Sequence, residues 1–216
     1  MKKASHLTWI TILIALLPAG YLALVYDQLP ATVPTHFGVD MQPDRMREKA
    51  ELWVVTGIMA VVSIGMYFLL RNLNRIDPKR KGAGPSSSFN KLAFGLVVFI
   101  SAFGFIIIAS AKGAIAIQNY LFPLLGIMFA FIGNYMHHIK PNYFAGIRLP
   151  WTLSSDENWR RTHQLAGKLW FAGGILIAVA SLLFPVKSMV PVFLSITAVI
   201  TLIPVVYSYR LFKQQV

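Results

Sequence analysis

Two apolar runs of this chain are joined by the stretch Lys140-Pro141-Asn142-Tyr143-Phe144-Ala145-Gly146-Ile147-Arg148-Leu149-Pro150-Trp151-Thr152. It belongs to the longest polar interruption in the C-terminal half of the sequence. Because proline disfavours helical geometry in the residue before it, Lys140 and Leu149 are predicted to be extended. A single helix therefore cannot run through the stretch, and the sequence predicts two membrane-spanning helices joined by an ordered loop.

The composition places the chain in the class of integral membrane proteins. Of its 216 residues, 56% are hydrophobic and only 13% are charged, and it has no cysteine. Six apolar runs are long enough to cross a hydrocarbon core of ~30 Å as helices. They cover residues 7–26, 52–70, 92–111, 114–136, 168–186 and 188–209. The predicted fold is an all-α bundle of six transmembrane helices.

The lysine and arginine residues predict the orientation of this bundle. With the N-terminus inside, fifteen of them fall in the cytoplasmic segments and five in the extracytoplasmic ones. Both termini are therefore predicted to be cytoplasmic. The formal net charge of +12 comes from short flanks of the spans and forms no single patch, so we expect no direct nucleic acid binding. Residues 27–51 become an extracytoplasmic loop, and residues 137–167, named here the motif loop, become cytoplasmic.

Two units are predicted along the chain. Residues 1–90 form a two-helix N-terminal unit, and residues 91–216 form a four-helix C-terminal unit. Residues 71–91, which contain basic residues, glycine, proline and serine, are predicted to be a flexible cytoplasmic linker. In the Pro-rich loop 27–51 we expect a short strand-like segment around Pro34 that ends in a turn at Gly38.

The second half of the motif loop has a helical pattern. Ser154 and Glu157 have the spacing of a capping box, which predicts that a helix begins there. Trp159 and His163 then lie on one stripe with Ala166 and Trp170, so both are predicted to point inward, towards the preceding loop. Arg148 is the leading candidate for binding, because its planar guanidinium suits a carboxylate, a phosphate or a set of carbonyl groups.

Several short motifs appear in a fixed order. They are Gly-Asn at 133–134, Lys-Pro-Asn-Tyr-Phe at 140–144, Gly-Ile-Arg at 146–148, Pro-Trp-Thr-Leu at 150–153, Trp159, and Thr-His at 162–163. Their order and spacing resemble the C-terminal domain of the SdpI family of bacterial multi-pass immunity proteins. The Leu-Pro at 29–30 and the Pro-x-His-Phe at 34–37 resemble the N-terminal domain of unknown function found in the same family. Leu149 and Gln164 depart from the pattern, in which we expect Thr and Arg.

The resemblance implies a candidate binding motif in the motif loop and the helix before it. Its residues are Asn134, Lys140, Pro141, Asn142, Phe144, Gly146, Arg148, Pro150, Trp151, Thr152, Trp159, Thr162 and His163, with Pro34 and His36 in the extracytoplasmic loop. The alternative interpretation is structural: Asn134, Asn142, Thr152 and His163 would then only satisfy backbone groups of a buried turn.

The resemblance also implies a function and partners. Family members lie in the bacterial cytoplasmic membrane and protect the cell against a secreted peptide toxin. They also act as receptors that, once the toxin engages, hold a cytoplasmic transcriptional repressor at the membrane. The implied partners are the lipid bilayer, a peptide toxin and such a repressor, while the oligomeric state stays open.

Rival functions have weaker support in the sequence. A small-molecule or lipid transporter remains an alternative. The spans carry no charged residue between their ends, which counts against a transporter coupled to protons. An enzyme at the inner interface, with His163 and Arg148 in its site, is a further alternative. No Gly-rich phosphate loop and no nucleophile elbow is present, so we expect neither catalysis nor a cofactor. His137 and His138 point in different directions on a helix, so we expect no metal site.

Gly126 and Ala130 have the spacing for close helix packing.

Overall fold

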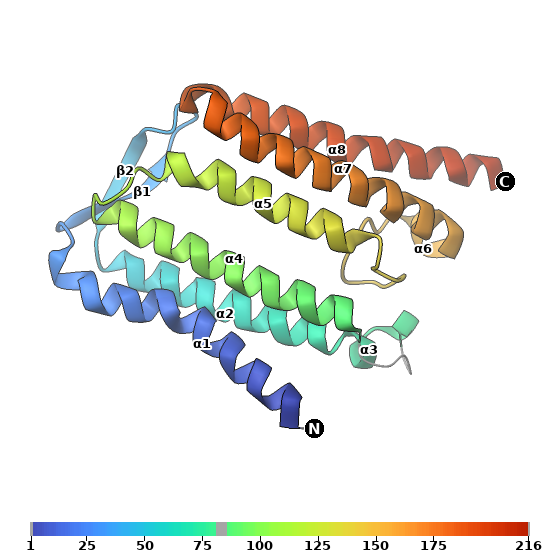
Figure 1. Ribbon diagram of the computed structural model, residues 1–216, viewed down its shortest axis with the longest axis horizontal. Coiled ribbons are helices and arrows are strands. Elements are labelled where there is room, and N and C mark those ends of the chain that lie inside the picture. The colour runs from blue at the N-terminus through green and yellow to red at the C-terminus, as the bar shows by residue number, and fades with distance from the viewer. Residues whose placement is uncertain (1, 81–85, 216) are drawn as a thin grey trace.

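The protein is a bundle of long helices with a small hairpin at one end (Figure 1). The computed structural model describes residues 2–80 and 86–215. Its long helices are α1 (Lys2–Val25), α2 (Glu51–Arg71), α4 (Ser87–Ala111), α5 (Gln118–Met136), α7 (Asp156–Leu183) and α8 (Val186–Gln215). These six described helices are long and apolar enough to cross a membrane. The six predicted spans are therefore confirmed.

The outward faces of these helices are apolar. Leu24, Val61 and Leu182 are among the large hydrophobic side chains that lie exposed, each by more than two thirds of its surface. A soluble monomer does not expose apolar surface over such an extent, whereas the hydrocarbon core of a bilayer covers it without cost. The protein is thus a multi-pass membrane protein whose helices face lipid.

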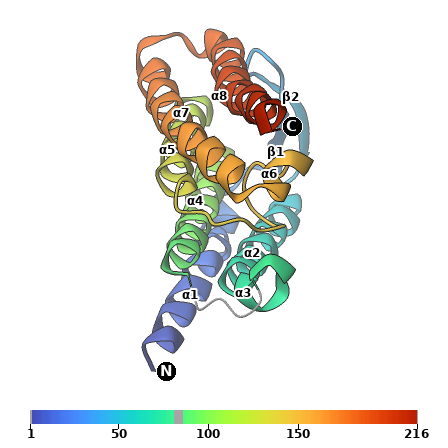
Figure 2. The ribbon, with the colours of Figure 1, turned by 90° about the vertical axis from the view of Figure 1, so that its right-hand side faces the viewer.

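The helices pack as two groups of three. Seen from the end of the bundle, α1, α2 and α4 lie on one side, α7 and α8 on the other, and α5 between α4 and α7 (Figure 2). Within the first group, the hydroxyl of Ser101 on α4 donates to the carbonyl of Ile14 on α1 at 2.8 Å. Helix α4 thus packs with the N-terminal helices, while the unit boundary near residue 90 stays a prediction.

The closest helix pair is α5 with α7. A Cβ added at Gly126 would lie 2.6 Å from the backbone of Ala178, and one at Gly174 would lie 2.3 Å from the amide nitrogen of Ala130. Such distances mean that the two backbones touch without side chains between them, which only small residues permit. The packing expected from Gly126 and Ala130 is therefore observed, and it fixes α7 against α5.

The loop between α1 and α2, predicted to be extracytoplasmic, contains a β-hairpin. Strand β1 (Thr32–Phe37) pairs antiparallel with β2 (Pro43–Glu48), and Met41, in the turn, has a φ of 61°. The extended segment predicted at Pro34 is confirmed as β1, whereas its pairing with β2 was not predicted. Val33 packs among α1, α2 and α4, and Met41 packs against α5, α7 and α8. The hairpin therefore joins the outer ends of both helix groups.

The segment predicted as a flexible linker is partly helical. Residues Leu73–Ile76 form the short helix α3, and Pro78–Arg80 form a single 3₁₀ turn. Asp77 between them is buried. Its carboxylate anchors this stretch to the motif loop, and residues 87–91 of the predicted linker belong to α4, while the flexibility of the linker stays a prediction. Residues 81–85 lie outside the described residues.

Both termini lie at the same end of the bundle as the motif loop, and the hairpin lies at the opposite end (Figure 1). This arrangement follows because six antiparallel crossings, an even number, return the chain to the end of the bundle at which it began. It places the segments rich in lysine and arginine at one end, as the orientation prediction requires.

Candidate functional site: the motif loop

The motif loop has three parts. An irregular stretch leads from the end of α5 at Met136 to Leu149, the short helix α6 (Pro150–Ser154) follows, and the first turns of α7 complete the loop. Helix α7 extends twelve residues before the predicted span because its polar first turns continue beyond the apolar part. The predicted capping box is wrong by one residue: Ser155, not Ser154, accepts from the amide of Asn158 at 3.2 Å. Glu157 instead pairs with the side chains of Arg160 and Arg161.

Asn142 organises the irregular stretch. Its side chain is fully buried, and its Nδ2 donates to the carbonyls of Lys140 at 3.0 Å and Ala145 at 2.9 Å. Its Oδ1 accepts from the amides of Phe144 at 2.8 Å and Ala145 at 2.7 Å. One amide side chain thus satisfies four backbone groups of a turn, which is how asparagine stabilises compact loops. For Asn142 the structural interpretation holds.

His163 connects α7 to the same stretch. Its Nδ1 lies 2.8 Å from the carbonyl oxygen of Trp159, and its Nε2 lies 3.0 Å from the amide nitrogen of Ile147. A carbonyl can only accept and an amide can only donate, so these partners assign a neutral ring with its proton on Nδ1. The Trp159 ring stacks on the imidazole with centroids 4.1 Å apart, and its Nε1 donates to the carbonyl of Ile139 at 2.7 Å.

These contacts confirm the inward stripe of α7. Trp159, His163 and Ala166 are buried, and Trp170 is half-buried. Both nitrogens of the His163 ring are engaged by backbone groups, so neither is left to act as a general base.

Gly146 makes the approach of the loop to His163 possible. Its φ is +112°, a conformation that residues with a side chain rarely adopt. A Cβ at this position would lie 2.4 Å from Nε2 of His163 and 3.2 Å from the ring of Trp159. Glycine is required here for both its backbone freedom and its size.

Helix α6 closes the loop through Thr152. Its buried hydroxyl donates to the carbonyl of Ile147 at 2.7 Å and accepts from the amide of Leu149 at 2.9 Å. Leu149 is the residue before the helix, where a threonine could cap and a leucine cannot. Thr152, at the third position of α6, bonds back to the backbone amide of this residue.

Helix α8 holds α6 and α7 in place. Nε1 of Trp151 donates to the hydroxyl of Ser208 at 2.9 Å, and its ring lies 5.3 Å from that of Tyr209. Asn158, fully buried, donates through Nδ2 to the carbonyl of Ser208 at 2.9 Å and accepts from the hydroxyl of Thr162 at 3.0 Å. Trp151, one of the candidate motif residues, thus docks one helix on another.

Asp77 reaches the loop from the other helix group. Its buried carboxylate accepts from the amide of Tyr143 at 2.7 Å and from the amide of Lys79 at 2.8 Å. Nζ of Lys79 donates to the carbonyl of Leu153 and lies 5.8 Å from the centre of the Tyr143 ring. The loop is therefore held between both halves of the bundle.

Four side chains between Lys140 and Leu149 remain exposed. They are Lys140, Tyr143, Phe144 and Arg148, named here the loop face. The guanidinium of Arg148 donates to the carbonyl of Tyr143, and no carboxylate among the described residues forms an ion pair with it. The loop face thus presents two cations and two aromatic rings on a backbone that the buried residues hold rigid.

The candidate residues therefore separate into groups. Asn142, Thr152, Trp159, Thr162 and His163 form the buried support, with Pro141 and Trp151 half-buried beside them. Pro150, exposed, opens α6 at its first position. Asn134 is exposed on α5, and no hydrogen bond among the described residues joins its side chain to this support. Pro34 and His36 lie at the opposite end in β1, where Nδ1 of His36 lies 2.6 Å from a carboxylate oxygen of Asp44.

Three residues of the support were missed by the sequence analysis: Asp77, Asn158 and Ser208. Asp77 had a signal, because it is the sole acidic residue between positions 52 and 155 and stands among lysines and arginines. Asn158 had a weaker signal, since it lies one helical turn before Thr162. Among the described residues, no three side chains of His, Asp or Glu come together in a group able to hold a metal.

Comparison with known proteins relates this site to a family. Residues 138–208, which contain most of the motif loop and α8, match the SdpI/YfhL protein family. Residues 13–60, which contain the hairpin, match a domain of unknown function, DUF1648. Over residues 138–208 the chain is similar to the SdpI/YfhL family. The resemblance seen in the short motifs is thereby confirmed.

Two relatives extend this result. The immunity protein SdpI of Bacillus subtilis is 22% identical over 205 residues, which are 95% of this chain and 95% of that protein. An uncharacterized protein of Archaeoglobus fulgidus is 46% identical over 41 residues, 19% of this chain and 22% of that protein. No solved structure is significantly similar to the chain.

Proposed function

We propose that this protein is an immunity protein of a bacterial cytoplasmic membrane that protects the cell against a secreted peptide toxin. The observation that carries the proposal is the similarity to an immunity protein along 95% of both chains, including the hairpin and the motif loop. A match that extends over the whole length favours a shared mode of action over the reuse of one domain.

The outer hairpin is the part that would meet the toxin first. Strand β2 is exposed along its whole length and carries Arg45 and Arg47, while β1 carries the candidate residues Pro34 and His36. A two-stranded sheet leaves backbone donors and acceptors open along its edges, and an extended peptide can pair with them. The apolar helix faces beside the hairpin would accept the rest of a membrane-active peptide.

The loop face is the part that would hold a cytoplasmic repressor. Tyrosine, phenylalanine and arginine, the residue types of three of the four loop-face residues, are enriched in protein interfaces. Tyr143 and Phe144 expose 45% and 39% of their surface although the backbone beneath them is fixed by Asn142. An ordered surface binds with a smaller entropy cost than a mobile one. The proposal gives no catalytic role to His163, because both its ring nitrogens are bonded to backbone groups.

Survival of a toxin-sensitive bacterium that expresses this chain tests the protective role. We expect more cells to survive exposure to the secreted peptide toxin than with an empty vector. Unchanged killing, with the protein present in the membrane, would remove direct protection from the proposal.

The receptor role needs variants that keep the loop folded. Arg148→Ala removes an exposed charge and one bond to a backbone carbonyl, so we expect normal accumulation but loss of induction of a repressor-controlled reporter. Arg160→Ala is the matched control, because Arg160 is an exposed arginine of the same loop that pairs with Glu157. If both variants induce the reporter normally, the loop face is not the repressor site. If Arg148→Ala fails to accumulate, its role is structural.

A further inference from the structure

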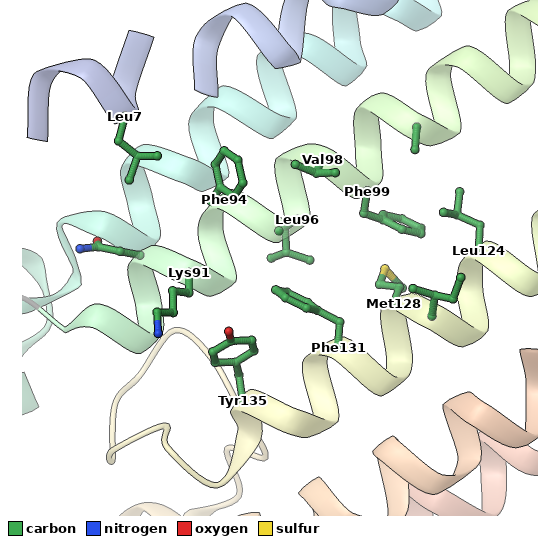
Figure 3. A pocket seen from close by; sticks show the side chains of 14 residues that line it. Leu7, Lys91, Phe94, Leu96, Val98, Phe99, Leu124, Met128, Phe131 and Tyr135 are labelled. Carbon is green, nitrogen blue, oxygen red and sulfur yellow. The ribbon is translucent and has the colours of Figure 1, made fainter. Parts of the chain in front are cut away.

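A groove lies between α4 and α5, along the junction of the two helix groups (Figure 3). Its cavity volume is about 530 Å³, in the range of small-molecule sites. Phe94, Phe99, Leu124 and Met128 are among its many apolar lining residues. The groove is open to the surroundings of the bundle, since Ile127 on its rim is 60% exposed.

The polar lining residues gather at one end of this groove. Asn90 and Lys91 come from the start of α4, and Tyr135 comes from the end of α5. In Figure 3, Lys91 and Tyr135 lie together at one end, and Leu124 lies at the far end. This polar end of the groove lies at the same end of the bundle as the motif loop (Figure 1). The groove therefore has a polar mouth at the membrane surface and an apolar interior within the bilayer.

The length of the groove corresponds to one leaflet. Lys91 and Ala102, which both line it, are eleven residues apart on α4. At a rise of 1.5 Å per residue this spans about 16 Å, roughly half of a hydrocarbon core of ~30 Å. This length corresponds to an acyl chain of one leaflet. The depth of a pocket for a soluble compound is not set by the thickness of a leaflet.

The groove exists because the helix groups meet less closely here than at α5 and α7. Phe131 lies over Gly95, where an added Cβ would lie 2.1 Å from the ring. This contact brings the two helices together at one level, and the groove is the space that remains between them. In a bilayer this space does not stay empty, because apolar surface without contact atoms loses dispersion energy.

We propose that the groove binds an acyl chain of an anionic phospholipid from the leaflet on the motif-loop side. Lys91 is exposed at the mouth and forms no ion pair with a carboxylate among the described residues, so its ammonium can meet the lipid phosphate. The hydroxyl of Tyr135 is a second donor beside it. Basic residues at the mouth of an apolar groove select anionic headgroups, and the apolar walls hold the chain.

Photo-crosslinking in lipid nanodiscs tests this proposal directly. The full chain is placed in nanodiscs of equal amounts of phosphatidylglycerol and phosphatidylcholine, and one of the two lipids at a time carries a photoactivatable acyl chain. We expect crosslinks to concentrate on peptides of α4 and α5, and more strongly with phosphatidylglycerol. Crosslinks spread evenly over all outward helix faces would overturn the proposal.

Two pairs of variants separate the headgroup from the chain. Lys91→Gln is expected to lower the preference for phosphatidylglycerol by roughly fivefold, while Lys112→Gln at the other end of α4 leaves it unchanged. Ala102→Trp fills the groove and is expected to reduce crosslinks from both lipids, while Leu182→Trp on the exposed face of α7 does not. Circular dichroism and gel filtration check that each variant is folded.

Alternative occupants give different results. If Lys91→Gln leaves the lipid preference unchanged, the mouth does not bind the headgroup. If Ala102→Trp leaves crosslinking unchanged but dissolves a dimer, a second copy of the chain covers the groove. If Ala102→Trp does not fold, Val98→Trp on the groove rim tests the same prediction, since Val98 is 41% exposed and a larger side chain has room there. Unreduced crosslinking in Val98→Trp would count against the proposal.

Discussion

Replacing Gly146 by alanine tests the central contact of the motif loop. The added Cβ would lie 2.4 Å from Nε2 of His163, on a backbone with a φ of +112°. The loop must move away from α7, and the bond from the amide of Ile147 to the imidazole is then lost. We expect the motif loop to open locally while the helix bundle stays folded.

The expected cost follows from three contributions. Backbone strain at a positive φ contributes about 1–2 kcal/mol. Crowding in a packed site costs about 1–3 kcal/mol, and a buried acceptor left without its donor about 1–3 kcal/mol. These contributions overlap, because the movement that relieves the crowding also breaks the bond. Allowing for this overlap, we expect a local destabilisation of about 3–5 kcal/mol.

Amide hydrogen exchange of a peptide containing Ile147 measures this opening. Gly113→Ala is the control, because Gly113 has a φ of +79° but nothing within 4 Å of an added Cβ, so it reports strain alone. We expect Gly146→Ala to lower protection at the Ile147 amide by about a hundredfold to a few thousandfold, with no such change in Gly113→Ala. If protection at Ile147 is equal in Gly146→Ala and the parent protein, the proposed contact with His163 does not hold the loop.

Three further predictions follow from the same structure. Asn142→Ala removes four side-chain hydrogen bonds and is expected to destabilise the loop by about 2–4 kcal/mol, seen as faster proteolysis between residues 140 and 149; unchanged cleavage would contradict this role. Gly174→Ala separates α5 from α7 and is expected to lower the melting temperature in detergent by the equivalent of about 1–3 kcal/mol. Gly57→Ala is the control, because Gly57 has open space around it and its melting temperature should not change. Equal melting temperatures of the two variants would refute the close packing. Phe144→Cys is expected to resist an impermeant maleimide in intact cells and Val39→Cys, in the hairpin turn, to react; labelling of position 144 from outside would reverse the orientation.

Much of the fold could be predicted because a bilayer demands long apolar helices. The predicted span 52–70 corresponds to α2 at Glu51–Arg71, and the span 92–111 to the apolar part of α4. Hydropathy reports the part of a helix that crosses lipid and not the helix itself. The predicted span at 168 therefore missed the first turns of α7, which the capping pattern placed within one residue.

The candidate site could be predicted only in part. The spacing of Trp159 and His163 indicated that both face inward, because helical periodicity is local. Their partners, the carbonyl of Ile139 and the amide of Ile147, depend on how the loop folds back over α7. Backbone partners cannot be identified from residue types, so the roles of these side chains could not be assigned from the sequence.

The sequence by itself determined that this chain lies in a membrane, where its six apolar spans lie along the chain, and which end of the bundle carries the basic segments. These properties follow from local hydropathy, charge and helical spacing. Only the tertiary structure decided that Asp77 holds Tyr143 across sixty-six residues and that Ser208 binds both Trp151 and Asn158. Such contacts join segments far apart in the chain, and each requires that the helices first be packed in one particular order.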